Sequence, residues 1–275
     1  MNWTTWIEVN LDALAHNLKE IQAQTNAQVC VVVKGDAYGH GAPVVVHWLQ
    51  RQGTRLFAVS DVEEALAIRS VSQAPLLLLG PPLVEQLPLV VKKRLIPTIM
   101  DFHLIEPLER LASLSGIKQP VHLKVDTGLG RLGVTPENAL ALAMRIARSP
   151  SLILEGVFTH FADGADRGQT GRQLRVFLSL KALFAEAGIT SPIWHAANSP
   201  AFCLGHHTHL DMVRIGTLLY GQGYSGTTMS LKETWSLLTR VIAVKEVRAG
   251  SKIGYGGTYR AKKDMVVGVI PVGYS

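Results

Sequence analysis

The sequence predicts an α/β fold in which a (β/α)8 TIM-like barrel precedes a partial, mostly β C-terminal domain. Three observations predict it. The 275 residues are 47% hydrophobic and only 17% charged, which favours parallel strands buried on both faces. Short apolar runs alternate with helical segments through residues 1–228, as in a barrel. In residues 229–275, strand-like runs follow one another across glycine-rich turns with no helical segment between them.

Eight apolar runs are expected to form the strands of the barrel, because each has the length and composition of a fully buried strand. They are Val29–Val33, Leu56–Val59, Pro75–Leu79, Leu95–Ile99, Val121–Val125, Ile153–Phe158, Pro192–Ala196 and Met212–Tyr220. A doubly wound open sheet shows the same alternation. The sequence therefore leaves open whether this sheet closes.

Segments with helical spacing lie between most of these runs. Examples are Leu11–Gln24, Pro43–Gln50, Asp61–Ile68, Pro136–Arg148 and Arg172–Ala187. Beyond residue 228 the expected strands are Trp235–Val247, Ser251–Tyr259 and Met265–Val272. The final VGVIPVGYS stops inside an apolar run, so we expect a chain that is shortened within its β domain.

Composition and charge argue against several classes of protein. The net charge of +6 is spread along the chain, and no basic run is interleaved with aromatic residues, so we expect no nucleic-acid partner. The most apolar stretch, Ala74–Val91, contains four prolines and Glu85, so we expect no membrane span. The polar start MNWTTWIEVN does not resemble a secretion signal, and the only two cysteines fit a reducing compartment. A cytoplasmic protein is expected.

The residues at the predicted strand ends are the candidates for chemistry, since active groups of barrels gather there. Lys34 ends the first apolar run, where desolvation would lower the pKa of its amine and free it to form a Schiff base. A lysine that merely reaches solvent is the alternative. Lysine, arginine, histidine, serine and glycine converge at the other strand ends, which favours a site for an anionic cofactor.

Two motifs suggest functions that their context disfavours. Gly128–Gly133 matches the dinucleotide pattern G-x-G-x-x-G, but the next helix begins only near Thr135, so the glycines do not open it. We interpret the segment as a loop whose shape its glycines permit and which aims Arg131 inward. His206, His207 and His209 suggest zinc, yet no cysteine or Glu-x-x-His spacing accompanies them. A solvated histidine loop is favoured, and no metal is expected.

Three further residues have open interpretations. His160 ends a strand and is either a structural histidine or a catalytic one. Ser199 precedes a short helical stretch and either caps it or binds a phosphate. Tyr255, in IGYGGTY, is either a turn residue or a base whose pKa is lowered by cationic neighbours.

Taken together, six motifs resemble those of alanine racemases, PLP-dependent enzymes with a barrel and a β domain. They are VVVKGDAYGHG, HLKVDTGLGRLGV, THFADGAD, AANSPA, VRIGTLLYG and GYGGTY, in the order of that family and along the whole chain. The resemblance implies an isomerase that interconverts L- and D-alanine and supplies D-alanine for peptidoglycan. It also implies a homodimer whose active site is shared between subunits.

The resemblance further implies roles for individual residues. Lys34 is expected to bind pyridoxal 5'-phosphate covalently and to act as one of two bases. Tyr255 of the partner subunit is expected to be the second base, acting on the face of the substrate opposite Lys34. Arg131 would contact the substrate carboxylate and the phenolic oxygen of the cofactor. Its neighbour Lys124 is expected to be carbamylated.

Other residues resemble those that hold the cofactor in this family. Arg214 is expected to face the pyridine nitrogen, and His160 to link it to the second base and lower the pKa of that base. The expected phosphate contacts are the side chains of Tyr38 and Ser199 and the backbone amides of Gly216 and Thr217.

The sequence departs from the family pattern at Gly35, where alanine is common, and at its end, which comes before further site residues of the β domain. Four alternatives therefore stay open: a racemase of serine or another small amino acid, a decarboxylase of diamino acids with the same fold, a PLP carrier without enzymatic activity, and an inactive fragment.

Overall fold

The computed structural model describes residues 3–190 and 192–273. The chain divides into two units: Leu11–Glu233 forms one, and Met1–Asn10 together with Thr234–Ser275 forms the other. The boundary predicted between residues 228 and 229 thus lies close to the division after Glu233. The first ten residues, which the prediction assigned to the barrel domain, belong to the second unit.

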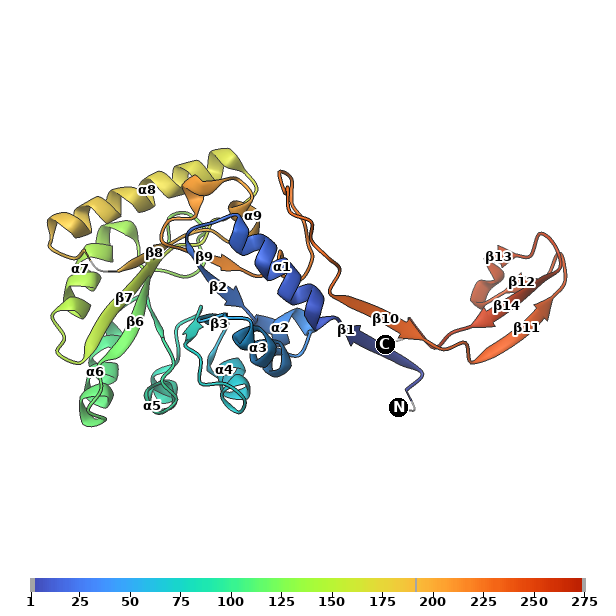
Figure 1. Cartoon of the computed structure of the whole chain (residues 1–275), viewed down its shortest axis with the longest axis horizontal. Coiled ribbons are helices and arrows are strands. Elements are labelled where there is room, and N and C mark those ends of the chain that lie inside the picture. The colour runs from blue at the N-terminus through green and yellow to red at the C-terminus, as the bar shows by residue number, and fades with distance from the viewer. Residues whose placement is uncertain (1–2, 191, 274–275) are drawn as a thin grey trace. The chain divides into compact units, whose positions relative to one another are not determined.

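The larger unit is built around eight parallel strands (Figure 1). They are β2 (Gln28–Val32), β3 (Phe57–Val59), β4 (Leu76–Leu78), β5 (Thr98–Ile99), β6 (Gln119–Lys124), β7 (Leu152–Phe158), β8 (Ile193–His195) and β9 (Met212–Ile215). Their order is β4-β3-β2-β9-β8-β7-β6-β5. A parallel bridge joins Leu77 of β4 to Ile96, which lies just before β5, so the sheet closes into a barrel. The doubly wound alternative is wrong.

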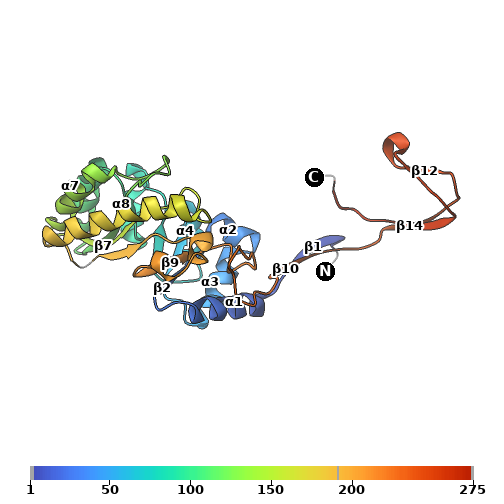
Figure 2. The same cartoon turned by 90° about the horizontal axis from the view of Figure 1, so that it is seen from above.

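Helices cover the outside of this barrel (Figures 1 and 2). They are α1 (Leu11–Ala23), α3 (Ala42–Arg51), α4 (Val62–Arg69), α5 (Leu87–Lys92), α6 (Ile105–Leu114), α7 (Pro136–Ala147) and α8 (Arg167–Glu186), with 3-10 turns η1 (Val84–Gln86), η2 (Phe102–Leu104) and η3 (His206–Thr208). Two short elements, α2 (Lys34–Gly39) and α9 (Ser199–Phe202), lie instead at the mouth of the barrel, after β2 and β8. Helix α8 begins five residues before its predicted start at Arg172, because the carboxylate of Asp166 caps it by accepting from the backbone N–H of Gln169.

The period of two along each strand determines what lies inside the barrel. One cluster of buried residues inside the barrel is apolar, and it consists of Cys30, Val32, Leu56, Ala58, Leu77, Ile96 and Met212. On β9, Met212 and Arg214 are both fully or almost fully buried two residues apart, so the apolar layer gives way to charge toward the carboxyl end of the strand. The strand ends at Ile215, earlier than the predicted Tyr220, because residues from Gly216 on turn along the mouth of the barrel.

The second unit contains three two-stranded antiparallel sheets. Its elements are β1 (Thr5–Val9), β10 (Trp235–Thr239), β11 (Ala243–Val247), β12 (Lys252–Ile253), η4 (Tyr255–Gly257), β13 (Tyr259–Arg260) and β14 (Met265–Val269). The pairs are β1 with β10, β11 with β14, and β12 with β13. The predicted single strand Trp235–Val247 is two strands with different partners, which a local pattern cannot reveal.

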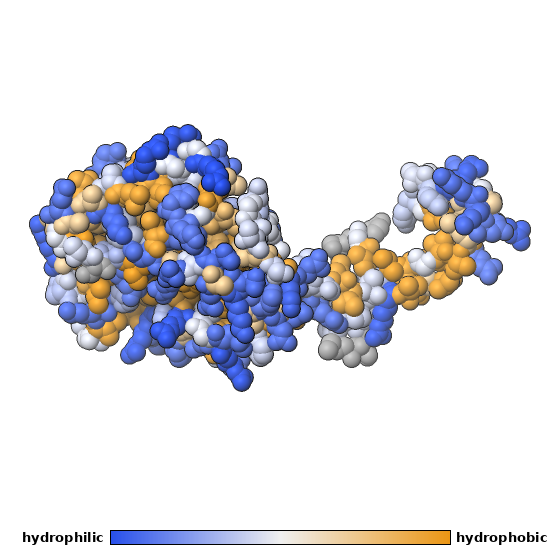
Figure 3. Space-filling view, turned by 45° about the horizontal axis from the view of Figure 1, so that its top comes forward, coloured by the Kyte–Doolittle hydropathy of each residue, from blue (hydrophilic) through white to orange (hydrophobic). Residues whose placement is uncertain are grey.

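Apolar side chains are exposed on this second unit, as Figure 3 shows by colour. Leu237, Val244 and Val266 are each more than half exposed. Singly exposed apolar residues are ordinary, whereas a contiguous apolar surface is typical of a surface that another protein segment covers. In the part of the chain that the structure describes, no helix has both the length and the apolar character to cross a membrane.

Candidate functional site

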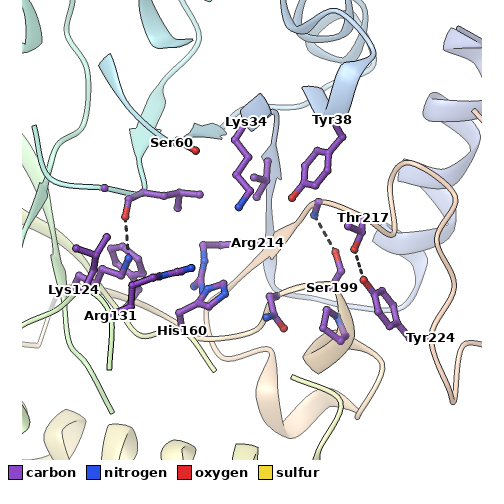
Figure 4. A pocket seen from close by; sticks show the side chains of 18 residues that line it. Lys34, Tyr38, Ser60, Lys124, Arg131, His160, Ser199, Arg214, Thr217 and Tyr224 are labelled. Atoms are coloured by element: carbon purple, nitrogen blue, oxygen red, sulfur yellow. Dashed lines mark hydrogen bonds between the residues drawn. The ribbon is translucent and has the colours of Figure 1, made fainter. Parts of the chain in front are cut away.

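A cavity of about 470 Å³ opens at the carboxyl ends of the barrel strands (Figure 4). Its lining is Val32, Lys34, Tyr38, Ser60, Leu79, Gly80, Lys124, Arg131, Leu132, Phe158, His160, Asn198, Ser199, Pro200, Arg214, Gly216, Thr217 and Tyr224. This set contains four cationic side chains. Among the described residues, no aspartate or glutamate lines the cavity, so its chemistry is suited to an anion.

Lys34 lies two residues beyond the end of β2, and its side chain enters the cavity (Figure 4). The chain then makes a left-handed turn in which Gly35, Asp36, Ala37 and Tyr38 all have φ between 52° and 59°. For each residue other than glycine, this conformation costs about 1 to 2 kcal/mol. The turn is sustained by the carboxylate of Asp36, which accepts from the backbone N–H of Ala42 at 2.7 Å. Such strain is concentrated at functional sites.

A carboxylate from α4 holds this turn from outside the cavity. Glu64 accepts from the backbone N–H of Gly35 at 2.6 Å and from that of Ser60 at 2.8 Å. Its own N–H donates to the capping carboxylate of Asp61 at 3.0 Å, which fixes the start of the helix. One side chain therefore ties together two strand ends that both line the cavity.

Lys124 and Arg214 lie close to each other at the floor of the cavity. The Nζ of Lys124 donates to the carbonyl of Leu79 at 3.1 Å. Burial, followed by the charges of Arg214 and Arg131, lowers the pKa of Lys124 to about 8. Both cations contact the ring of Phe158, at 5.3 Å for Lys124 and 5.2 Å for Arg214. A neutral amine at this position is therefore readily available near neutral pH.

Arg214 is almost fully buried and donates in several directions. Its Nη2 donates to the carbonyls of Thr159 and Ala196 at 2.8 and 2.9 Å, and lies 3.4 Å from Nδ1 of His160. Burial, and then the charge of Arg214, lower the pKa of His160 to about 3, so this ring is neutral. Because Arg214 occupies Nδ1 as a donor, the proton of His160 belongs on Nε2.

Arg131 lies on the loop between β6 and α7. The carboxylate of Asp126 accepts from the backbone N–H groups of Gly128, Leu129 and Arg131 at 2.8 to 3.1 Å, which shapes the loop. These hydrogen bonds lower the pKa of Asp126 against the opposing effect of its burial. Gly133 has φ of 138°, and a Cβ there would lie 2.5 Å from the backbone N of Asp126. The glycines thus serve the loop, and Arg131 reaches the cavity.

Hydroxyl groups line the opposite wall. Oγ of Ser199 accepts from the backbone N–H of Gly216 at 3.0 Å and of Leu218 at 3.3 Å. The hydroxyls of Thr217 and Tyr224 are 2.6 Å apart. Gly216 leaves room for the Tyr38 hydroxyl, which a Cβ at that position would meet. The amide of Gly216, expected to face a phosphate, is used within the protein in this structure.

The histidine loop differs from its prediction at one residue. His206 and His207 are exposed, as expected of a solvated loop. His209 is buried: it stacks on Phe202 with ring centroids 4.3 Å apart, and its two nitrogens bond Thr25 and the carbonyl of Phe202. These contacts occupy both of its ring nitrogens. Within residues 3–190 and 192–273, no cluster of three or more metal-ligating side chains occurs.

The structure brings together most of the residues that the sequence predicted for the site. The cavity contains Lys34, Tyr38, Lys124, Arg131, His160, Ser199, Arg214, Gly216 and Thr217. Tyr255 is on the second unit, in the turn η4, and is 91% exposed. Its role stays a prediction.

Comparison with known proteins agrees with this geometry. Residues 9–223 match the family model of the alanine racemase N-terminal domain, and residues 234–275 match that of the C-terminal domain. The chain belongs to the alanine racemase family. Alanine racemase 1 of Caldanaerobacter subterraneus subsp. tengcongensis is 37% identical over 280 residues, which cover 98% of this chain and 72% of the relative.

Solved structures of this family share the fold. Alanine racemase from Clostridium difficile 630 superposes with a TM-score of 0.90 at 29% identity, covering all of this chain and 74% of that one. The alanine racemase of Bartonella henselae, solved with covalently bound pyridoxal phosphate, gives a TM-score of 0.84 at 25% identity and covers 99% and 76%. The chain thus spans about three quarters of the length of these two structures.

Sequence reasoning missed several residues of the site. Ser60, Asn198 and Tyr224 line the cavity, and Glu64 holds the Lys34 turn. Ser60 and Asn198 follow predicted strands and could have been found from that position. Tyr224 and Glu64 lie beyond the strand ends, and only the folded chain brings them to the site.

Proposed function

We propose that this chain is a PLP-dependent racemase that interconverts L- and D-alanine. The observation that carries the proposal is a lysine amine at the mouth of a barrel, in a cavity lined by three further cations and by no described carboxylate. Lys34 suits a cofactor with an aldehyde, and the cations suit one with a phosphate and a phenolate. Membership of the alanine racemase family supports alanine as the substrate.

The residues present fit PLP. Gly216 leaves space for the Tyr38 hydroxyl, and the hydroxyls of Ser199, Thr217 and Tyr224 lie on the same wall, where they would hold the phosphate. Lys34 would hold the aldehyde carbon covalently, and Arg214 would hold the ring nitrogen. When bound, PLP supplies an electron sink that makes the α-proton of an amino acid acidic.

Arg214 would act by keeping its own protons. A guanidinium gives up a proton reluctantly, so it donates a hydrogen bond to the ring nitrogen without protonating it. Burial lowers the pKa of Arg214 only to about 10, which still leaves it a cation at neutral pH. This arrangement favours racemisation over transamination.

Racemisation requires a base on each side of the α-carbon, because one fixed base would return the proton to the side from which it came. Nζ of Lys34 would serve one side and the hydroxyl of Tyr255 from the partner subunit the other. Nε2–H of the neutral His160, a residue that lines the cavity, would donate to that hydroxyl. Exposed apolar residues of the second unit, among them Leu237, Val244 and Val266, support a homodimer as the active assembly.

Arg131 would bind the carboxylate of alanine and the phenolic oxygen of the cofactor. Lys124 would then carry a carbamate, formed when its neutral amine adds CO2 and releases a proton. That group is anionic and would stabilise the cation of Arg131 in place of the repulsion between the two side chains. Its lowered pKa of about 8 supports this modification.

The physiological role we propose is supply of D-alanine for peptidoglycan in the cytoplasm. Cys30 and Cys203 are both free thiols, as is usual in a reducing compartment. Growth of a D-alanine auxotroph on expression of this chain is the direct test of that role.

The activity is tested by polarimetry with L-alanine and, separately, L-serine, using the chain with PLP. We expect the protein to abolish the optical rotation of L-alanine. Lys34→Ala should leave the rotation unchanged, whereas Lys92→Ala, at a lysine on α5 outside the cavity, should remain active. A chain that binds PLP at Lys34 yet leaves L-alanine unchanged would contradict the proposal. Faster loss with L-serine would move the substrate to another small amino acid.

A further inference from the structure

A chain of hydrogen-bonded polar side chains runs from the cavity through the barrel interior to the surface. It begins at Arg214 on β9, whose Nη1 lies 2.9 Å from Nδ1 of His195 on β8. Nε2 of His195 lies 2.9 Å from Nδ1 of His122 on β6. Nε2 of His122 lies 3.3 Å from a carboxylate oxygen of Glu155 on β7. Neither histidine nor Glu155 lines the cavity, so the proposed reaction does not use them directly.

The two ends of this chain determine where its protons lie. A guanidinium can only donate, so Nδ1 of His195 must accept and its proton must be on Nε2. That Nε2–H then donates to Nδ1 of His122, which places the proton of His122 on Nε2 as well. A carboxylate can only accept, so Glu155 receives this last hydrogen bond. All three hydrogen bonds therefore point the same way, from Arg214 to Glu155.

Burial makes this arrangement rigid. His195 is fully buried and His122 is 1% exposed. Burial, with the charges of Arg214 and His122, holds the pKa of His195 well below its ordinary range, so the ring stays neutral and can accept. The side chain of Glu155 is 39% exposed, so its charge is solvated at low cost. The carboxylate thus lies at the surface end, and the cation at the buried end.

The packing around the two rings is specific to them. The ring of Phe158 stacks on His195 with centroids 4.8 Å apart and an interplanar angle of 11°. Gly156 lies beside His122, and a Cβ there would be 2.5 Å from Nδ1 and Cε1 of that ring. A glycine on the strand is therefore what allows the imidazole its place inside the barrel.

We propose that His195, His122 and Glu155 are positioning residues that hold Arg214 as a fixed cation at the cavity. Glu155 is its counter-charge, and two neutral imidazoles connect the two by hydrogen bonds. The carbonyls of Thr159 and Ala196 and Nδ1 of His160 share the Nη2 hydrogens, and His195 takes one of the Nη1 hydrogens. Because Arg214 itself lines the cavity, these contacts fix its guanidinium there. The consequence for catalysis rests on the proposed function, whereas the proton positions do not.

The first test is the nitrogen NMR of the PLP-loaded protein labelled with 15N-histidine, assigned with His195→Gln and His122→Gln. We expect both rings to be neutral and protonated on Nε2. A proton on Nδ1 of either ring, or a charged imidazolium, would overturn the proposal. This measurement decides it even if the protein racemises nothing, an outcome that would count against the proposed function alone.

The second test is kinetic. Glu155→Gln keeps a hydrogen-bond acceptor but removes the charge, and His122→Phe interrupts the chain. We expect kcat for alanine to fall by about three- to tenfold in Glu155→Gln and further in His122→Phe, with KM unchanged and transamination raised relative to racemisation. Glu109→Gln, which loses a surface ion pair with Arg145, is the matched control. Equal kcat in Glu155→Gln and Glu109→Gln would refute the role of the counter-charge.

Discussion

Replacing Glu64 by glutamine tests how firmly the Lys34 turn is held. The glutamate carboxylate accepts two backbone hydrogen bonds, from Gly35 at 2.6 Å and from Ser60 at 2.8 Å. Glutamine has nearly the same shape but only one acceptor oxygen, so its NH2 must face one of the two N–H donors. The substitution therefore removes one charge-assisted hydrogen bond and places two donors against each other.

The size of the effect follows from that count. A hydrogen bond to a charged group contributes about 1.5 to 3 kcal/mol, so we expect the free energy of unfolding of the barrel to fall by about 2 kcal/mol. The residues of the turn have positive φ and need such support. If the same loss is felt when PLP binds to the turn, its Kd rises by up to about 30-fold, since 1.4 kcal/mol is tenfold.

Urea unfolding and a PLP titration followed by absorbance measure the two quantities. Glu63→Gln is the matched control, because this neighbouring glutamate on the same helix accepts a hydrogen bond from the side chain of Gln86 and, among the described residues, none from the Lys34 turn. We expect that variant to lie within about 0.5 kcal/mol of the wild type. If Glu64→Gln and Glu63→Gln lose the same free energy of unfolding and bind PLP equally well, the role of Glu64 in holding the Lys34 turn is refuted.

Three further predictions concern the other walls of the cavity. Gly133 has φ of 138°, and a Cβ there would lie 2.5 Å from Asp126 N, so Gly133→Ala should lower the free energy of unfolding by about 3 kcal/mol and raise KM for alanine through Arg131. Gly130 has open space around it, so Gly130→Ala should lower the free energy of unfolding by about 1 kcal/mol. Equal losses in urea unfolding would contradict this. Because the pKa of Lys124 is lowered to about 8, about a quarter of its amine is neutral at pH 7.5, and 13C-bicarbonate should give a carbamate signal in NMR that disappears in Lys124→Arg and weakens as the pH falls below 7; a signal that persists in the variant would place the modification elsewhere. Ser199→Ala leaves the N–H groups of Gly216 and Leu218 without their acceptor, so it should lower the free energy of unfolding by about 1 to 2 kcal/mol and weaken PLP binding. Ser179→Ala, on the surface of α8, should do neither. Equal PLP affinity in the two variants would argue against a role of Ser199 in holding the phosphate.

The hydrogen-bonded chain from Arg214 to Glu155 lies among two kinds of side chain. Apolar residues such as Leu77 and Met212 fill part of the barrel interior, and the cations line the cavity. Polar groups at this depth are tolerated because each has a partner of the right kind: a donor cation, two rings that both accept and donate, and an acceptor anion. The cationic site is thereby supported without a carboxylate inside it.

The sequence by itself determined the repeating strand-and-helix pattern and most of the site. Buried parallel strands must be apolar throughout, so runs such as Val121–Val125 are visible without a structure. Active groups gather at the ends of such strands: Lys34, Arg131 and His160 follow one, Arg214 lies within β9 near its end, and all four line a single cavity. Periodicity and position along the chain are local properties, which is why sequence reasoning could find these residues.

The tertiary structure alone decided what depends on contacts between distant segments. Closure of the barrel rests on one bridge between Leu77 and Ile96, and the alternation of elements is the same for a closed and an open sheet. Strand β1 pairs with β10 across more than two hundred residues, so the first ten residues leave the barrel unit. The hydrogen bond between His122 and His195 joins residues 73 apart in the chain. No local pattern encodes such pairings, because they arise only when folding brings the strands side by side.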